Sequence, residues 1–96
     1  MGAGSKLSRE EIEQALATLS GWSLAEGKLH REFRFPDFVR AFGFMARCAL
    51  IAEAMDHHPE WCNVYGRVSV DLITHTAQGV TARDVELAQR MNELAD

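Results

Sequence analysis

Two segments of alternating apolar and polar residues, each centred on a tight-turn signal, constrain the fold of this chain most. The first runs from Trp22 to Phe35 around the dipeptide Glu26-Gly27. The second runs from Trp61 to Leu72 around Gly66, a natural position for a positive φ angle. Strands joined by such short turns pair in antiparallel fashion. The sequence therefore predicts two β-hairpins, each with one buried face.

Helix signals flank the two hairpins. Ser8 opens a capping box, and the apolar spacing after it predicts a short helix closed by a left-handed turn at Gly21. Thr81 repeats this signature with Asp84 in the place of the usual glutamate, and a final helix is expected to run to about Leu94. Both helices are amphipathic, so each is expected to bury one face.

A longer helix separates the hairpins. Pro36-Asp37 is a helix-start signal, and Pro59 disfavours helix for the residue before it, so we expect this helix to run to about Asp56. Its apolar residues are too widely spread for packing on one sheet alone. We therefore expect this helix to be covered on two sides, and a subunit partner is one way to provide the second cover. The apolar residues that show this spread include Phe38, Val39, Phe42, Met45, Ala46, Ala49, Leu50, Ala52 and Met55.

These elements give the order α-β-β-α-β-β-α. Short hairpins in this order predict an α+β fold, with a four-stranded antiparallel sheet and helices packed on one face. A chain of 96 residues is too short for two independent cores, so we expect a single domain over residues 7–96. Residues 1–6, rich in glycine, are expected to form a flexible leader.

Charge and hydropathy exclude several classes of protein. Ten Lys and Arg residues are scattered among fourteen Asp and Glu, for a net charge of −4, which argues against a nucleic-acid-binding protein. The longest apolar stretch, 41–55, is interrupted by charges and falls short of the ~20 residues of a membrane span. Cys48 and Cys62 form no CxxC motif, and no apolar signal sequence is present. We therefore expect a cytoplasmic protein.

Titratable residues gather after the long helix. Glu53 stands one helical turn before the pair His57-His58, and His75 sits at the end of the fourth predicted strand. Arg83 and Asp84 lie in the first turn of the last helix. Helix ends, strand ends and helix starts commonly meet along one edge of a small α+β domain. Since imidazole populates both protonation states near neutral pH, such a cluster is suited to acid–base chemistry.

Each of these residues also has a structural interpretation. Glu53 alone could be a solvated helix residue, His57 a cation at a helix C-terminus, and Asp84 half of a capping box. His30 is expected on the surface, and Trp61 and Tyr65 could simply pack.

Two other kinds of site are disfavoured. A metal site using the histidines lacks the i, i+4 spacing of helical zinc motifs, so we expect no metal. A nucleophilic Cys62 would need a nearby base, and a half-buried strand residue is the simpler expectation.

The same residues resemble the signature of the pterin-4a-carbinolamine dehydratases, a family also described as dimerisation cofactors of a homeodomain transcription factor. The signature is an acidic residue, His-His-Pro, an aromatic residue, a histidine and an aspartate at fixed spacing. All positions match, and the resemblance covers nearly the whole chain. The matching residues are Glu53, His57, His58, Pro59, Tyr65, His75 and Asp84.

This resemblance implies a reaction and a set of roles. The reaction is dehydration of 4a-hydroxytetrahydropterin to quinonoid dihydropterin, with no metal or cofactor beyond the pterin substrate. His57 and His75 would be the acid–base residues, and His58 would mainly bind the pterin. Glu53 and Asp84 would orient the imidazoles or bind the ring. The remaining expected pocket residues are Pro59, Trp61 and Arg83.

The resemblance also implies an assembly. Its members form homotetramers built as dimers of dimers, which agrees with the wide apolar surface of the long helix, and a homodimer is the simpler version. The alternative to an enzyme is a protein-interaction module of the same fold that acts as a dimerisation or assembly cofactor. An intact histidine set favours the enzyme, since a pure adaptor has no need of it.

Overall fold

A computed structural model describes residues 4–95 and shows the predicted order α-β-β-α-β-β-α, with one additional 3-10 turn, η1. No helix among these residues is long and apolar enough to cross a membrane. Residues 1–3 of the predicted leader lie outside the described residues. The elements are α1 (Arg9–Leu16), β1 (Ser23–Ala25), β2 (Lys28–Arg34), α2 (Phe38–Met55), β3 (Glu60–Val64), β4 (Arg67–Leu72), η1 (His75–Ala77) and α3 (Ala82–Ala95).

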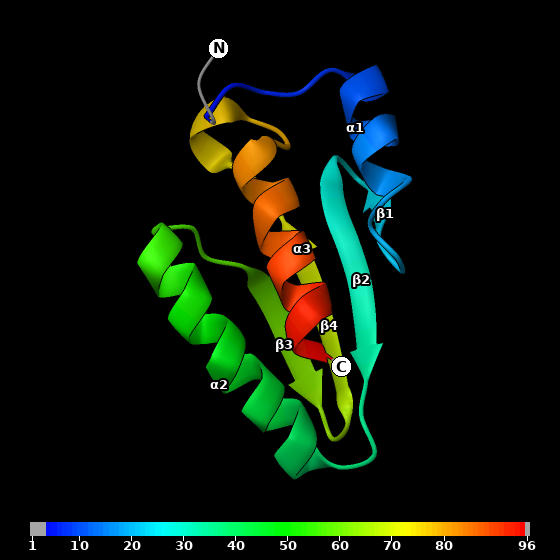
Figure 1. The fold of residues 1–96 in the computed structure, drawn as a ribbon, viewed down its shortest axis with the longest axis vertical. Coiled ribbons are helices and arrows are strands. Elements are labelled where there is room, and N and C mark those ends of the chain that lie inside the picture. The colour runs from blue at the N-terminus through cyan, green and yellow to red at the C-terminus, as the bar shows by residue number, and fades with distance from the viewer. Residues whose placement is uncertain (1–3, 96) are drawn as a thin grey trace.

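The four strands form one antiparallel sheet in the order β1-β2-β4-β3. The register places Leu29 opposite Leu72 and Phe33 opposite Val68, so the buried residues of the two central strands share one face. Helices α2 and α3 lie across this face (Figure 1). The α+β fold with helices on one face is therefore confirmed. We call the other side, which presents His30, Glu32, Arg34, Glu60, Cys62, Val64, Arg67, Ser69 and Asp71, the open face.

Helix α2 has one buried and one exposed apolar side. Ala41, Phe44, Cys48 and Ala52, spaced three or four residues apart, are at most 1% exposed. Burial raises the pKa of the Cys48 thiol to about 12, so this thiol stays protonated and packs as an apolar group. The exposed side carries large apolar residues that the described chain does not cover: Phe38, Val39, Phe42 and Leu50, which are 52–77% exposed.

The first helix ends earlier than predicted. Helix α1 stops at Leu16, and two tight turns follow, in which the amides of Thr18 and Leu19 donate to carbonyls three residues back. These turns bury the side chain of Leu19, which is 2% exposed. A helix that continued past Leu16 would have placed this side chain elsewhere. Gly21 does adopt the left-handed conformation, with φ of 85°, but it does so at the entry to β1.

The second hairpin turn also differs from prediction. The left-handed φ, 52°, belongs to Tyr65, not to Gly66. Glycine is needed at 66 for a different reason: a Cβ atom there would lie 2.3 Å from the carbonyl oxygen of Phe35. The Phe35 amide donates to the Gly66 carbonyl at 2.7 Å, and this contact holds the end of β2 against the turn.

Candidate active site

All three histidines of the predicted cluster line one open hollow of about 380 Å³. His57 and His58 follow the left-handed C-cap of α2, Asp56, whose φ is 52°. His75 begins η1 rather than ending the fourth strand as predicted, because β4 stops at Leu72 and the chain then turns. Arg83 comes from the first turn of α3. We call this hollow the histidine pocket. Its full lining is Asp56, His57, His58, Ile73, Thr74, His75, Thr76 and Arg83.

Arg83 fixes the segment that holds two of these histidines. One terminal guanidinium nitrogen, Nη2, donates to the carbonyls of Met55 and Asp56, each at 2.7 Å. These carbonyls lie at the C-terminus of α2, where a cation is also favoured by the helix dipole. Arg83 therefore both lines the pocket and holds the backbone immediately before His57.

The contact between His57 and Asp84 is buried. Nε2 of His57 lies 2.5 Å from Oδ1 of Asp84, and the two side chains are 8% and 0% exposed. The other carboxylate oxygen, Oδ2, accepts hydrogen bonds from the Thr74 hydroxyl and the Thr81 amide, both at 2.8 Å. Asp84 thus contacts both the residue that precedes α3, through the Thr81 amide, and the imidazole of His57.

The other two histidines make exposed carboxylate contacts. Nε2 of His58 lies 2.9 Å from Glu53, and Nε2 of His75 lies 2.9 Å from Oε2 of Glu60. Lys28 reaches the second oxygen of Glu60 at 2.6 Å. The hydrogen bond from Lys28, and next that from His75, lowers the pKa of Glu60, while Glu60 raises the pKa of Lys28.

One arrangement is common to all three rings. Each histidine contacts its carboxylate through Nε2, and these rings make no other polar contact with residues 4–95. A carboxylate at Nε2 favours a proton on that nitrogen and leaves Nδ1 as the nitrogen that can exchange a proton with a ligand. The pocket therefore presents three imidazoles with the same nitrogen engaged.

Glu60 and Lys28 were not among the residues predicted from the sequence. Glu60 directly follows Pro59 inside the histidine motif, and its alternation with Trp61 placed it on the polar side of the strand, which was a usable signal. Lys28 gave none. It stands 32 residues away from Glu60, and only the order of the strands brings the two together.

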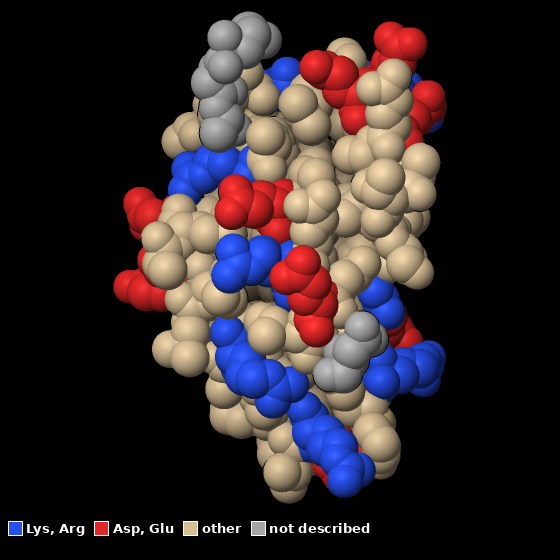
Figure 2. All heavy atoms as spheres, viewed as in Figure 1, with Lys and Arg blue, Asp and Glu red and all other residues tan. Residues whose placement is uncertain are grey.

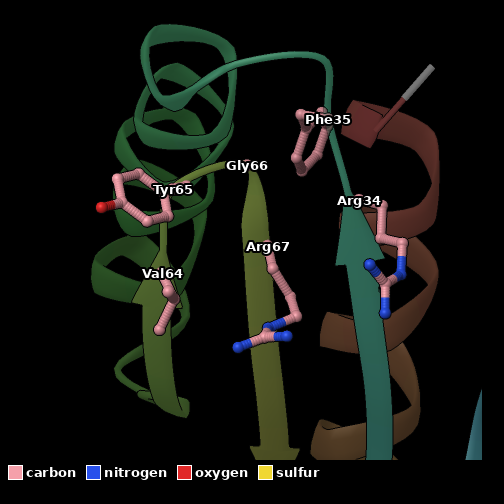
Figure 3. Close-up of a pocket in the computed structure, with 6 residues that line it drawn as sticks. All are labelled: Arg34, Phe35, Val64, Tyr65, Gly66 and Arg67. Atoms are coloured by element: carbon pink, nitrogen blue, oxygen red, sulfur yellow. The ribbon is translucent and has the colours of Figure 1, made fainter.

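Three aromatic or proline residues of the sequence motif do not line the histidine pocket. Pro59 and Trp61 are not among the residues that line the histidine pocket, and Trp61 packs against the core. Tyr65 is 82% exposed at the β3–β4 turn. It lines a different hollow, together with Arg34 and Arg67, which lie on the neighbouring strands β2 and β4 (Figure 3). A pocket role for Pro59 and Trp61 remains a prediction.

His30 and Cys62 both lie on the open face. His30 lies on the open face, with Nδ1 2.9 Å from Asp71. Cys62 is exposed on the same face, so the expectation that it is half-buried was wrong, because the edge strand β3 has no cover on this side. Within residues 4–95, no three His, Cys, Asp or Glu side chains are grouped so as to hold a metal ion.

Comparison with known proteins identifies the family. The sequence model of the family "Pterin 4 alpha carbinolamine dehydratase" matches residues 5–94. The chain belongs to this family. A relative assigned to the pterin-4-alpha-carbinolamine dehydratases from Solibacter usitatus (strain Ellin6076) is 57% identical over 90 residues, 94% of this chain and 95% of the relative. One from Rhodopseudomonas palustris (strain BisB18) is 59% identical over 92 residues, 94% of this chain and 91% of the relative.

A solved structure agrees with this assignment. The crystal structure of a Brucella melitensis protein, described as a transcriptional coactivator/pterin dehydratase, superposes with a TM-score of 0.93. It is 48% identical in sequence, and the match covers 96% of this chain and 100% of that one. At this identity the similarity extends beyond the fold to the family.

Proposed function

We propose that this chain is a pterin-4a-carbinolamine dehydratase, which converts 4a-hydroxytetrahydropterin to quinonoid dihydropterin and water. Membership of the family supports the reaction class. The single observation that supports the site is the histidine pocket, where three carboxylate-bound imidazoles line one hollow.

The reaction needs one proton given and one proton removed. The lone pair of a ring nitrogen expels the 4a hydroxyl, which leaves as water once an acid has protonated it, and a base takes the proton from the ring nitrogen. Hydroxide is a poor leaving group, so one well-placed acid contributes about 10²- to 10⁴-fold in rate. Histidine suits both roles because its two protonation states coexist near neutral pH.

The pocket suggests how these roles divide. His57 and His75 are the acid–base pair of this proposal, and His58 mainly binds the pterin. His57 is buried and held by Asp84, whereas the side chain of His75 is 73% exposed. Arg83 lines the pocket from the first turn of α3, and Glu53 orients His58.

A coupled assay with purified protein tests the activity. We expect faster loss of the carbinolamine than in buffer, and an unchanged rate after treatment with a chelator, because the proposal uses no metal and no cofactor beyond the substrate. His30→Ala is the matched control, since this histidine also contacts a carboxylate but lies outside the pocket. A rate equal to that in buffer, with folded protein, would contradict the proposal.

The exposed side of α2 supports a proposal about assembly: the chain forms a homodimer or a homotetramer through this helix. Phe38 and Phe42 pack against each other with ring centroids 5.8 Å apart and ring planes tilted by 45°, and Val39 and Leu50 are exposed on the same helix. Burying such a patch is favourable by roughly 25 cal/mol per Å².

In Figure 2 the face that carries α2 and α3 shows charges of both signs, with a diagonal band of Lys and Arg across its lower half.

Light scattering coupled to size-exclusion chromatography tests the assembly. Leu50→Asp places a charge on a side chain that is 73% exposed, so the subunit should still fold but the oligomer should dissociate. Gln89→Asp, on the exposed surface of α3, is the control and should leave the mass unchanged. A wild-type mass equal to one chain would contradict the proposal.

A second function, as a protein-interaction module, is favoured by the same surface and by the Brucella melitensis protein described as a transcriptional coactivator. The two functions are compatible, because the exposed apolar side of α2 faces away from the sheet, whereas the histidine pocket lies at the C-terminal end of this helix.

We also propose a cytoplasmic location, which the family and the cysteine usage support.

A further inference from the structure

Three side chains from three parts of the chain form a continuous hydrogen-bonded series on the open face. Lys28 at the start of β2 donates to Oε1 of Glu60 at 2.6 Å, and Oε2 of Glu60 lies 2.9 Å from Nε2 of His75. Glu60 begins β3 and His75 begins η1. Each oxygen of the Glu60 carboxylate thus has a different cationic or imidazole partner.

We propose that Glu60 is the positioning residue for His75, and that Lys28 fixes Glu60 for this task. The carboxylate holds the proton of His75 on Nε2 and leaves Nδ1 as the nitrogen that faces the substrate. The inference rests on the proposed function, in which His75 exchanges a proton with the pterin. It adds two residues that neither the resemblance nor the family assignment names.

The geometry favours a role in orientation over a role in stability. The side chains of His75, Glu60 and Lys28 are 73%, 42% and 33% exposed, and ion pairs this exposed contribute little to folding. A side chain as exposed as His75 would otherwise sample several rotamers. A carboxylate already held by Lys28 restricts that freedom without a change in the core.

The charges around the series are arranged to keep Glu60 ionised. Asp71 on β4 is its neighbour across the strands, and this aspartate is itself engaged by His30. Glu26 in the first hairpin turn acts on Lys28 at longer range. The hydrogen bond from Lys28, and next that from His75, outweigh the effect of desolvation and lower the pKa of Glu60, so the ionised carboxylate can accept a hydrogen bond from His75 at neutral pH.

Glu60→Gln tests the inference, with Glu32→Gln as the matched control. Glu32 is another exposed glutamate of the open face, but it pairs with Arg34 and contacts no histidine. We expect Glu60→Gln to lower kcat by about threefold to tenfold with KM changed less than twofold, because orientation of an acid–base group acts in the chemical step. Lys28→Gln should give a smaller loss in the same direction, and Glu32→Gln none.

The second readout is the protonation pattern of His75, observed by ¹⁵N NMR of the imidazole. In the wild type we expect the neutral ring to carry its proton on Nε2, and in Glu60→Gln we expect a mixture of the two tautomers. A wild-type kcat in Glu60→Gln, or the same tautomer in both proteins, would overturn the inference. If the wild type itself showed no dehydratase activity, the proposed function would fail, while the NMR comparison would still decide whether Glu60 holds His75.

Discussion

Two histidine–carboxylate contacts lie at opposite extremes of burial: His57–Asp84 and His75–Glu60. The same kinds of atom meet in both, but the consequences differ. The first is 8% and 0% exposed, and the second is 73% and 42% exposed. Both use Nε2 of the imidazole and one carboxylate oxygen. The contrast shows that a contact distance alone does not say whether a pair serves stability or activity.

The environment decides between these roles. Asp84 is enclosed with Thr74, Thr81 and His57, and each of its oxygens has a partner, so removing it leaves buried polar groups without one. Water can replace either partner of the exposed pair at little cost. We therefore assign stability mainly to the buried pair and orientation for chemistry to the exposed one.

Removal of Asp84 should have the largest effect. Asp84→Ala takes away the cap of α3 and the partner of His57 together, and breaking a buried pair in this way costs about 3–5 kcal/mol in the free energy of unfolding. Urea denaturation measures the loss. Asp71→Ala is the control, because Asp71 also contacts a histidine but its side chain is 38% exposed. Equal stability in the two variants would mean that burial does not distinguish the pairs.

Replacing the histidines should separate activity from stability. His75→Ala should lower kcat by about 10²-fold, the contribution of one acid or base, without changing Tm. His57→Ala should lower both kcat and Tm, since it leaves Asp84 with an unpaired buried oxygen. Assay and thermal denaturation of the same preparations give both values. A large drop in Tm for His75→Ala would remove the contrast.

The two helix caps repeat the comparison on a smaller scale. The hydroxyl of Ser8 accepts from the amide of Glu11 at 3.1 Å in an exposed capping box, whereas the contact at the start of α3, in which the Asp84 carboxylate accepts from the Thr81 amide, is buried. Ser8→Ala should therefore cost only about 1 kcal/mol in the free energy of unfolding, the ordinary value for an exposed cap. The measurement is urea denaturation beside Asp84→Ala. A loss as large as that of Asp84→Ala would contradict the ranking.

The smallest expected effect is the pH dependence contributed by Glu60. Its pKa in the folded chain is below its ordinary value of 4.5, chiefly through Lys28. Stabilisation by this carboxylate is therefore present above pH about 4.5 and lost as the pH falls through the lowered pKa. The Tm values of wild type and Glu60→Gln should differ slightly at neutral pH and converge in acid. A difference in Tm between the two proteins that grew toward low pH would contradict this prediction.

The sequence predicted the elements better than their ends. The periodicity of apolar residues and the capping signals placed the three α-helices and four strands, because these signals are local. The early end of α1 and the left-handed Tyr65 depended on what those turns touch elsewhere in the fold: Leu19 in the core and the carbonyl of Phe35 beside Gly66. Such tertiary contacts leave no local pattern.

The same limit applied to the site. The positions of four residues at helix ends and starts and at a strand end predicted that they lie together at one edge of the domain. These residues are His57, His58, His75 and Arg83. It did not reveal that Asp84 is fully buried, nor that Lys28 joins Glu60 from across the sheet. Partners of a known site residue depend on strand order and register, which a sequence pattern specifies only in part.

The most direct test of the central claim is the rate of carbinolamine dehydration by wild type and His75→Ala, measured at equal concentrations of protein shown to be folded. We expect the wild type to accelerate the reaction well above its rate in buffer, and His75→Ala to lose about 10²-fold in kcat at unchanged Tm. Equal rates for the two folded proteins would contradict the assignment of the exposed histidine to the chemistry.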